Sequence, residues 1–200
     1  RKLWISADSE KIRYTGRIDW SVPKAPKWLF PCTSSEFKFT GNTLKIHVKN
    51  KNEYWQNYLS CILDNVQSRF YIKKEGETKI EVRVNENETG VHHVLFFKRQ
   101  DSCHEVTILG YEIEDGEKLL ELPKKTDKRI EVYGDSVSAG EVSEAVDFVG
   151  KEDPEHEGGY SNSYYSYGWI LARKLGAQIH DIAQGGIALM DGEGWYHEPE

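Results

Sequence analysis

Long apolar runs are missing from this chain of 200 residues, and it does not open on a basic segment followed by an apolar one. A membrane-spanning helix needs about 20 predominantly apolar residues, and a secretory signal peptide needs a charged start and an apolar centre. We therefore expect a soluble protein with no membrane partner. Arg1 stands first instead of methionine, so we expect a trimmed chain whose compartment, secreted or cytoplasmic, stays open.

An excess of positive charge is also missing. The chain has 26 Lys and Arg against 33 Asp and Glu, for a formal net charge of −7. Because proteins hold the phosphate backbone with clustered cations, this balance argues against a nucleic-acid partner. The pair Lys124 and Lys125 is interpreted as part of a solvated linker.

Cysteine is scarce, and the histidines are not arranged as metal ligands. Cys32, Cys61 and Cys103 are widely spaced and form no Cys-x-x-Cys pair, which indicates neither a zinc site nor a disulfide framework. Buried free thiols fit this pattern better, with one disulfide and one free thiol as the alternative. The adjacent His92 and His93 of a predicted strand would point to opposite faces of its sheet. We therefore expect no metal and no other cofactor.

The first 125 or so residues contain a succession of short β patterns. The run 37–48 alternates apolar and polar residues, as a strand with one buried face does, and Asp64-Asn65 is a typical turn signal. No long helical period interrupts these patterns, which predicts a jelly-roll β-sandwich over residues 1–125. The charged segment 123–128 is the predicted linker, because its charges would be costly to bury.

Four tryptophans in this part, Trp4, Trp20, Trp28 and Trp55, raise the question of a carbohydrate-binding role for the sandwich. Tryptophans in sandwiches more often fill the core or a seam between domains, because they bury a large area and need a partner for one N–H group. We therefore interpret them as packing residues.

A candidate nucleophile follows the linker. Residues 129–134 read as a short strand that runs straight into Gly134-Asp135-Ser136. Gly134 permits a tight turn that would lift Ser136 above the end of the strand. A Gly-Asp-Ser tripeptide alone is a weak signal, since Asp and Ser are common in turns, where their side chains bond local amides. Asp135 is assigned that structural role.

The residues that follow strengthen the signal. Segment 161–176 begins with capping residues, has apolar positions at helical spacing and ends at a glycine, and 177–183 reads as a second strand that leads to Gly185-Gly186. Strand, loop, helix and strand form a βαβ pattern. Ligand sites of such units lie beyond the carboxyl ends of the parallel strands, where both Ser136 and the glycine pair are expected.

These two blocks resemble the first two sequence blocks of the SGNH (GDSL) hydrolases, and the nearer resemblance is to carbohydrate esterase family 2. The segments 90–99, 110–120 and 129–140 also resemble that family around its domain junction, so the likeness covers nearly the whole chain. The resemblance implies an α/β plus all-β protein. In it, a jelly-roll β-sandwich over residues 1–125 precedes the start of a flavodoxin-like SGNH domain over residues 129–200.

The resemblance also implies a serine esterase that removes acetyl groups from plant cell-wall polysaccharides such as xylan, without a cofactor. Ser136 would form the acyl-enzyme, and the amides of Ser136 and Gly186 would hold the oxyanion, with Gly185 as the less favoured alternative. Trp195 and Tyr196 are candidates for contact with a sugar ring of the acetylated polysaccharide or oligosaccharide. The sequence leaves a homo-oligomer open.

The general base is missing from the expected position. Family members carry a third-block asparagine and a base histidine far beyond the second block, but no Gly-x-Asn-Asp motif is found before Glu200 and no Asp-x-x-His follows the second block. Asp153-Pro-Glu-His156 matches the base pattern, but it precedes the predicted helix instead of following the last strand, so we interpret it as a solvated loop. His180 lies within a strand pattern, and His197 has no orienting acid near it. We therefore expect little turnover from residues 1–200 alone.

Two other functions stay open at this level. A non-catalytic carbohydrate-binding protein would use the sandwich, with the second domain vestigial. An SGNH esterase or lipase of another substrate class would use the same serine, because a fold does not determine a substrate.

Overall fold

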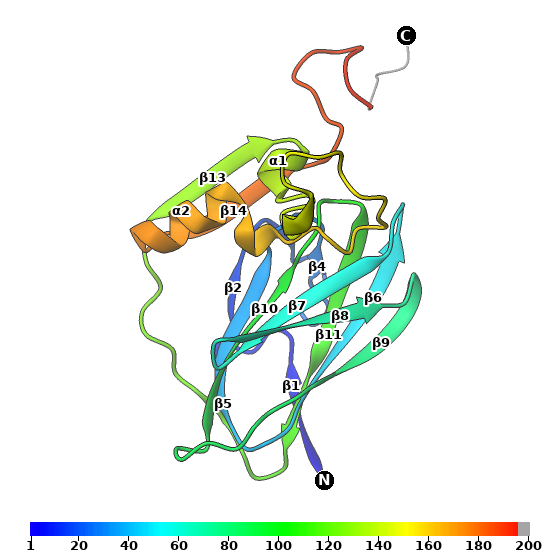
Figure 1. Cartoon of the computed structure of the whole chain (residues 1–200). Coiled ribbons are helices and arrows are strands. Elements are labelled where there is room, and N and C mark those ends of the chain that lie inside the picture. The colour runs from blue at the N-terminus through cyan, green and yellow to red at the C-terminus, as the bar shows by residue number, and fades with distance from the viewer. Residues whose placement is uncertain (196–200) are drawn as a thin grey trace.

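A computed structural model describes residues 1–195 of the chain, and it places a β-sandwich beneath a smaller α/β unit (Figure 1). One antiparallel sheet has the order β3-β4-β11-β6-β9, with β1 paired to β11. Its strands are β1 (Lys2–Ser6), β3 (Ile18–Asp19), β4 (Lys27–Trp28), β6 (Leu44–Asn52), β9 (Glu75–Val82) and β11 (His104–Glu114). The other has the order β12-β5-β10-β7-β8, with β2 paired to β5. Its strands are β2 (Arg13–Thr15), β5 (Ser34–Thr40), β7 (Asn57–Leu63), β8 (Val66–Ile72), β10 (Val91–Lys98) and β12 (Leu119–Leu120).

The predicted jelly-roll-like sandwich is confirmed, and the alternating pattern explains its core. Along β6, the side chains of Leu44, Ile46 and Val48 are buried while their neighbours are more exposed, so one face of the strand packs inward. Phe37 and Phe39 of β5 do the same from the facing sheet. Full burial of each such side chain stabilises the folded state by roughly 1.5–3 kcal/mol.

The predicted single run 37–48 is two strands. It breaks at residues 41–43, where Gly41 has a φ of 97° and the chain crosses from the sheet of β5 to the sheet of β6. Alternation continues across the crossing because both strands face the same core. The turn predicted at Asp64-Asn65 is confirmed, and both residues have positive φ, as a two-residue hairpin of type I′ requires.

The smaller unit follows a linker. It consists of β13 (Arg129–Gly134), α1 (Ser136–Ala139), two short 3-10 helices (Val146–Phe148 and Ser163–Tyr165), α2 (Tyr167–Leu175) and β14 (Gln178–Ala183). Strands β13 and β14 pair in parallel, and α2 packs against both, so the predicted βαβ pattern forms.

The helix of this unit is shorter than the predicted segment 161–176. The Ser166 side chain accepts a hydrogen bond from the Trp169 amide at 3.3 Å and starts α2, while Gly176 ends it in a left-handed conformation. Within the linker, Lys124 is exposed as predicted, but Lys125 is partly buried and donates to the Tyr14 carbonyl at 2.7 Å. That carbonyl gives the ammonium a partner, which makes the partial burial tolerable.

Trp169 and Ala172 of α2 form a second small core with Cys32, Phe97 and Ile179. Because Cys32 and Phe97 belong to the sandwich, the two units share this core. All three cysteines of the chain are buried and free, as the sequence analysis favoured. Among residues 1–195, no helix is long and apolar enough to cross a bilayer.

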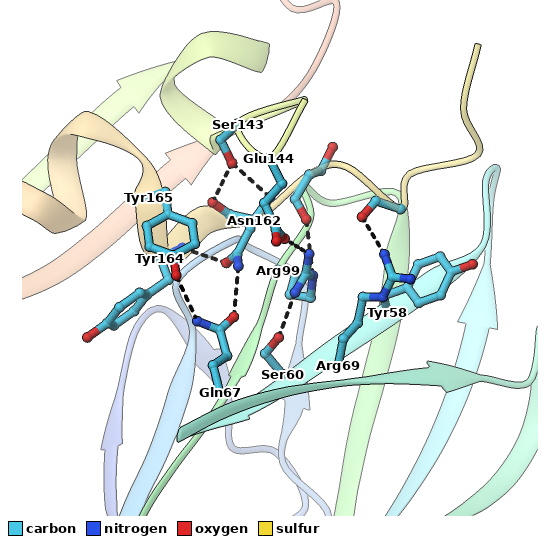
Figure 2. A network of polar contacts seen from close by, with 12 residues as sticks. Tyr58, Ser60, Gln67, Arg69, Arg99, Ser143, Glu144, Asn162, Tyr164 and Tyr165 are labelled. Carbon is cyan, nitrogen blue, oxygen red and sulfur yellow. Dashed lines mark hydrogen bonds and ion pairs between the residues drawn. The ribbon is translucent and has the colours of Figure 1, made fainter. Parts of the chain in front are cut away.

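Polar contacts also join the two units (Figure 2). Arg99, at the end of β10, donates to the Ser60 hydroxyl at 2.8 Å and to the Ser161 carbonyl at 3.1 Å, and it pairs with Glu144. Ser60 belongs to the sandwich, whereas Ser161 and Glu144 lie in the loops between α1 and α2. The guanidinium therefore ties the loops of the smaller unit to the sandwich.

Candidate active site

The β13–α1 turn presents Ser136 at the end of its strand. Gly134 is the last residue of β13, and a Cβ placed on it would lie 2.7 Å from the Cβ of Ser138, so a larger residue does not fit there. The Asp135 carboxylate accepts a hydrogen bond from the Val137 amide at 3.1 Å and caps α1, which confirms its structural role. Ser136 is half-buried at the first position of α1.

A second glycine-bearing turn starts beside it. Gly134 and Ala183 are register partners in the parallel pair, and the Gln184 amide donates to the Gly134 carbonyl at 3.1 Å. Residues Gly185 and Gly186 follow at once, so the two predicted loops leave the sheet from the same edge, as parallel strands require. Gly186 has a φ of 80°, which favours glycine.

The two loops meet at a cavity of about 560 Å³. Ser136 and both glycines line it, so the predicted nucleophile and the predicted oxyanion residues are brought together. Trp195 also lines it and is 86% exposed, whereas Tyr196 lies outside the described residues. The lining consists of Tyr54, Trp55, Ser136, Glu141, Gly185, Gly186 and Trp195.

Two lining residues come from the sandwich: the sequence analysis interpreted Trp55 only as a packing residue and did not single out Tyr54. Trp28 fills the core as predicted, but Trp55 lines the cavity together with Tyr54. The rings of Tyr54 and Trp55 contact each other at a centroid distance of 5.3 Å. They lie between β6 and β7, about 80 residues before Ser136. No pattern in the sequence indicates that this loop faces the nucleophile.

Glu141 adds a titratable group that the sequence analysis also missed. Burial raises the pKa of its carboxyl to about 7, the negative charge of Asp101 adds to the shift, and a polar contact with the Ser136 side chain opposes it. A Cβ placed on Gly185 would lie 3.1 Å from a Glu141 oxygen, so this carboxyl stands between the two loops. Glu141 therefore changes its charge near neutral pH beside Ser136.

The histidines weighed from the sequence lie elsewhere. The His156 ring packs on Trp55 at a centroid distance of 5.2 Å, and its Nδ1 accepts from the Gly158 amide at 3.0 Å. His180 lies within β14, and His197 is outside the described residues. Of residues 1–195, no histidine lines the cavity around Ser136.

A second cavity, of about 340 Å³, lies between the sandwich and α2, but its charged groups already have partners. Glu36 accepts from His93 at 2.8 Å and pairs with Arg13 at 3.2 Å. The Arg173 guanidinium stacks over the Tyr164 ring at 3.6 Å. These pairs are typical of a packed seam rather than of a reactive centre.

Asp181 is a buried carboxyl of β14 and is 1% exposed. One carboxylate oxygen accepts from the Cys32 thiol at 3.5 Å, and the other has no hydrogen-bond partner among the described residues. Burial raises the pKa of this carboxyl from 3.8 to about 7. Near neutral pH the native state therefore holds a proton that the unfolded chain has lost.

This proton makes stability depend on pH. Native stability should fall as the pH rises from about 4 to about 7, because over this range the unfolded chain loses the Asp181 proton while the native state still holds it. Asp181→Asn removes the charge, so its melting temperature should exceed that of the wild type at pH 8, by about 2–4 °C for each kcal/mol gained in a chain of this length, and match it at pH 4. Thermal melts at both pH values test this. The exposed Asp127→Asn is the control, and an equal gain at both pH values would contradict the charge argument.

Comparison with known sequences gives consistent matches. A family model described as carbohydrate esterase 2 N-terminal matches residues 14–123. The chain is 32% identical over 183 residues to the cellulase/esterase CelE of Acetivibrio thermocellus, and the matched region covers 91% of the chain and 21% of that protein. It is 26% identical over 186 residues to an acetylxylan esterase / glucomannan deacetylase of Cellvibrio japonicus, and the matched region covers 93% of the chain and 50% of that protein. The chain thus spans half or less of these curated relatives.

Solved structures agree. A family two carbohydrate esterase from Clostridium thermocellum, in complex with cellohexaose, superposes with a TM-score of 0.81 at 28% identity, over 94% of this chain and 55% of that one. A family two carbohydrate esterase from Cellvibrio japonicus has a TM-score of 0.83 at 22% identity, over 98% and 55%, and supports the fold. Since the family model matches more than half of the 200 residues and the relatives are carbohydrate esterases, the chain belongs to carbohydrate esterase family 2.

Proposed function

We propose that the protein containing this chain is a serine esterase that removes O-acetyl groups from plant cell-wall polysaccharides such as xylan. The observation that carries the proposal is the shared cavity of Ser136, Gly185 and Gly186 at the edge of β13 and β14. Residues 1–125 would form the jelly-roll domain, and residues 129–200 the N-terminal part of a flavodoxin-like SGNH domain.

In the proposed mechanism, the Ser136 hydroxyl attacks the acetyl carbonyl, and the acetyl group passes to this oxygen as the sugar leaves. The developing oxyanion needs N–H donors, for which we assign the amides of Ser136 and Gly186. The Gly185 amide already donates to Asp101 at 2.9 Å, whereas the Gly186 amide makes no hydrogen bond within residues 1–195. This difference supports Gly186 over Gly185.

The attack also needs a base to take the Ser136 proton. Since no histidine of residues 1–195 lines the cavity, the proposal requires a base, and a third oxyanion donor, from outside the described residues. An esterase whose nucleophilic serine lacks its base loses most of its catalytic rate, so residues 1–200 alone are expected to turn over the substrate poorly.

The proposed substrate class is supported by the relative that was solved with cellohexaose, a chain of sugars. Aromatic side chains suit the apolar face of a pyranose ring, and Tyr54, Trp55 and Trp195 line the same cavity as Ser136. We propose that Trp195 and Tyr196 contact the sugar that carries the acetyl group.

A fluorophosphonate probe on the full-length protein tests the nucleophile. Wild type should be labelled, and Ser136→Ala should lose both the label and deacetylation of acetylated xylan, because the probe bonds covalently to an activated serine. Ser143→Ala is the matched control. Its hydroxyl donates to the Asn162 carbonyl at 2.9 Å and does not line the cavity, so labelling should persist.

The same experiment separates the alternatives. Sugar binding without labelling would favour a non-catalytic carbohydrate-binding protein. Labelling with a preference for long-chain acyl esters over acetylated xylan would favour an SGNH esterase or lipase of another class. Labelling that survives in Ser136→Ala would refute the assignment of the nucleophile.

A further inference from the structure

Asp101 is a sandwich residue that reaches the glycine turn of the smaller unit. It lies in the loop between β10 and β11 and is 4% exposed. One carboxylate oxygen accepts from the Gly185 amide at 2.9 Å and from the Gln184 side-chain amide at 3.3 Å. The other accepts from the Cys103 amide at 3.2 Å. The oxygen that faces the glycine turn also accepts from the Tyr54 hydroxyl of the sandwich at 3.4 Å, so both oxygens are held and the carboxylate joins the two units.

The loop that carries Asp101 is itself anchored. The fully buried Lys98 ammonium donates to the Gln100 carbonyl at 3.0 Å and to the Asp101 carbonyl. The Ser102 amide donates to the Gln184 side-chain oxygen at 3.0 Å, beside the Asp101 contact. Hydrogen bonds to charged groups are among the stronger ones in proteins, so this loop is a rigid support.

The contact fixes the backbone of the glycine turn at Gly185. A Cβ placed on Gly185 would lie 2.8 Å from the Asp101 carboxylate, so the Gly185 backbone lies tight against the sandwich. Glycine peptides rotate more freely than others, and a pair of them needs an outside partner to hold one orientation. With the Gly185 amide engaged by Asp101, the next amide in the turn, that of Gly186, is the one left for the cavity.

We propose that Asp101 is a positioning residue for the esterase: by holding the Gly185 amide, it keeps the Gly186 amide oriented as an oxyanion donor. This assignment rests on the proposed function. It makes the jelly-roll sandwich part of the catalytic machinery, because the orienting carboxylate comes from the first unit and the oriented amide from the second.

Kinetics of the full-length protein test the assignment. Asp101→Leu removes the acceptor at similar size and should lower kcat by about 100-fold, as the loss of one oxyanion donor does, with KM within about threefold of wild type. Asp101→Asn keeps one oxygen acceptor and should stay within about tenfold. Arg69→Met is the control, because Arg69 also crosses the interface but donates to the Gly159 carbonyl at 2.8 Å, which is not part of the glycine turn. Rates are taken per active site titrated with the fluorophosphonate, so partial unfolding alone does not lower them.

Amide hydrogen exchange provides a readout that needs no turnover. The Gly185 amide of wild type should be protected, and Asp101→Leu should lose this protection. An active wild type with an unprotected Gly185 amide, or an Asp101→Leu variant with wild-type kcat, would overturn the Asp101 assignment alone. A wild type without labelling or turnover would overturn the proposed function, and the catalytic role of Asp101 with it.

Discussion

Gly134→Ala should lower kcat/KM for acetylated xylan by at least about 100-fold, the usual cost of moving a catalytic group by about 1 Å. The added methyl group would meet the Ser138 side chain, at 2.7 Å from its Cβ. Ser138 cannot move aside cheaply, because it is buried and its hydroxyl is hydrogen-bonded to the Tyr167 hydroxyl at 2.6 Å. The β13–α1 turn must open instead, and Ser136 moves with it.

Steady-state kinetics and the rate of fluorophosphonate labelling, both on the full-length protein, measure this effect. The matched control is the double variant Gly134→Ala with Ser138→Gly, which removes the side chain that the new methyl group meets. It should recover part of the lost rate. A single Gly134→Ala variant with wild-type labelling would show that the close approach does not position Ser136.

Arg99→Met should destabilise the joined units by about 3 kcal/mol, which corresponds to a fall of about 6–12 °C in melting temperature. Arg99 is 2% exposed, and it joins Ser60 of the sandwich to Ser161 and Glu144 of the loops (Figure 2). Methionine fills much of the space but leaves the Ser161 carbonyl without this donor inside the interface. An unpaired buried polar group costs about 1–3 kcal/mol by itself.

Thermal unfolding of wild type and variant tests this expectation. Arg69→Met is again the control, since Arg69 makes one interface bond, to the Gly159 carbonyl, from an exposed position. It should change the melting temperature by less than about 2 °C, in line with a surface substitution. If Arg99→Met has the same melting temperature as Arg69→Met, the buried network does not hold the units together.

The local features of the site could be predicted from the sequence because each depends on neighbours in the chain. Gly134 and Ser136 stand out because a strand pattern runs into a glycine and a small polar residue. Gly185 and Gly186 stand out at the end of a second strand. The parallel pairing then follows from the intervening helix, since a βαβ connection places both strand ends at one edge. The order of strands and helix along the chain therefore predicted that the nucleophile and the glycine turn would lie at the same edge of the sheet.

The exact ends of elements were less predictable. The run 37–48 looks continuous because its alternation does not change where the chain crosses between sheets, and only the position of Gly41 marks the break. The helix predicted over 161–176 starts six residues later, because Ser166 rather than an earlier polar residue caps it. Several residues of similar capping ability precede α2, so the sequence leaves the choice to packing.

By itself, the sequence determined the sandwich pattern, the βαβ order, the candidate serine and the family resemblance, all of which arise from short-range periodicity and motif spacing. The tertiary structure alone decided that Trp55 and Tyr54 of the sandwich line the Ser136 cavity, and that Asp101 holds the Gly185 amide. These contacts join residues more than 80 positions apart. Such pairs leave no periodic trace in the chain, because they depend on how the two units pack and not on the residues beside them.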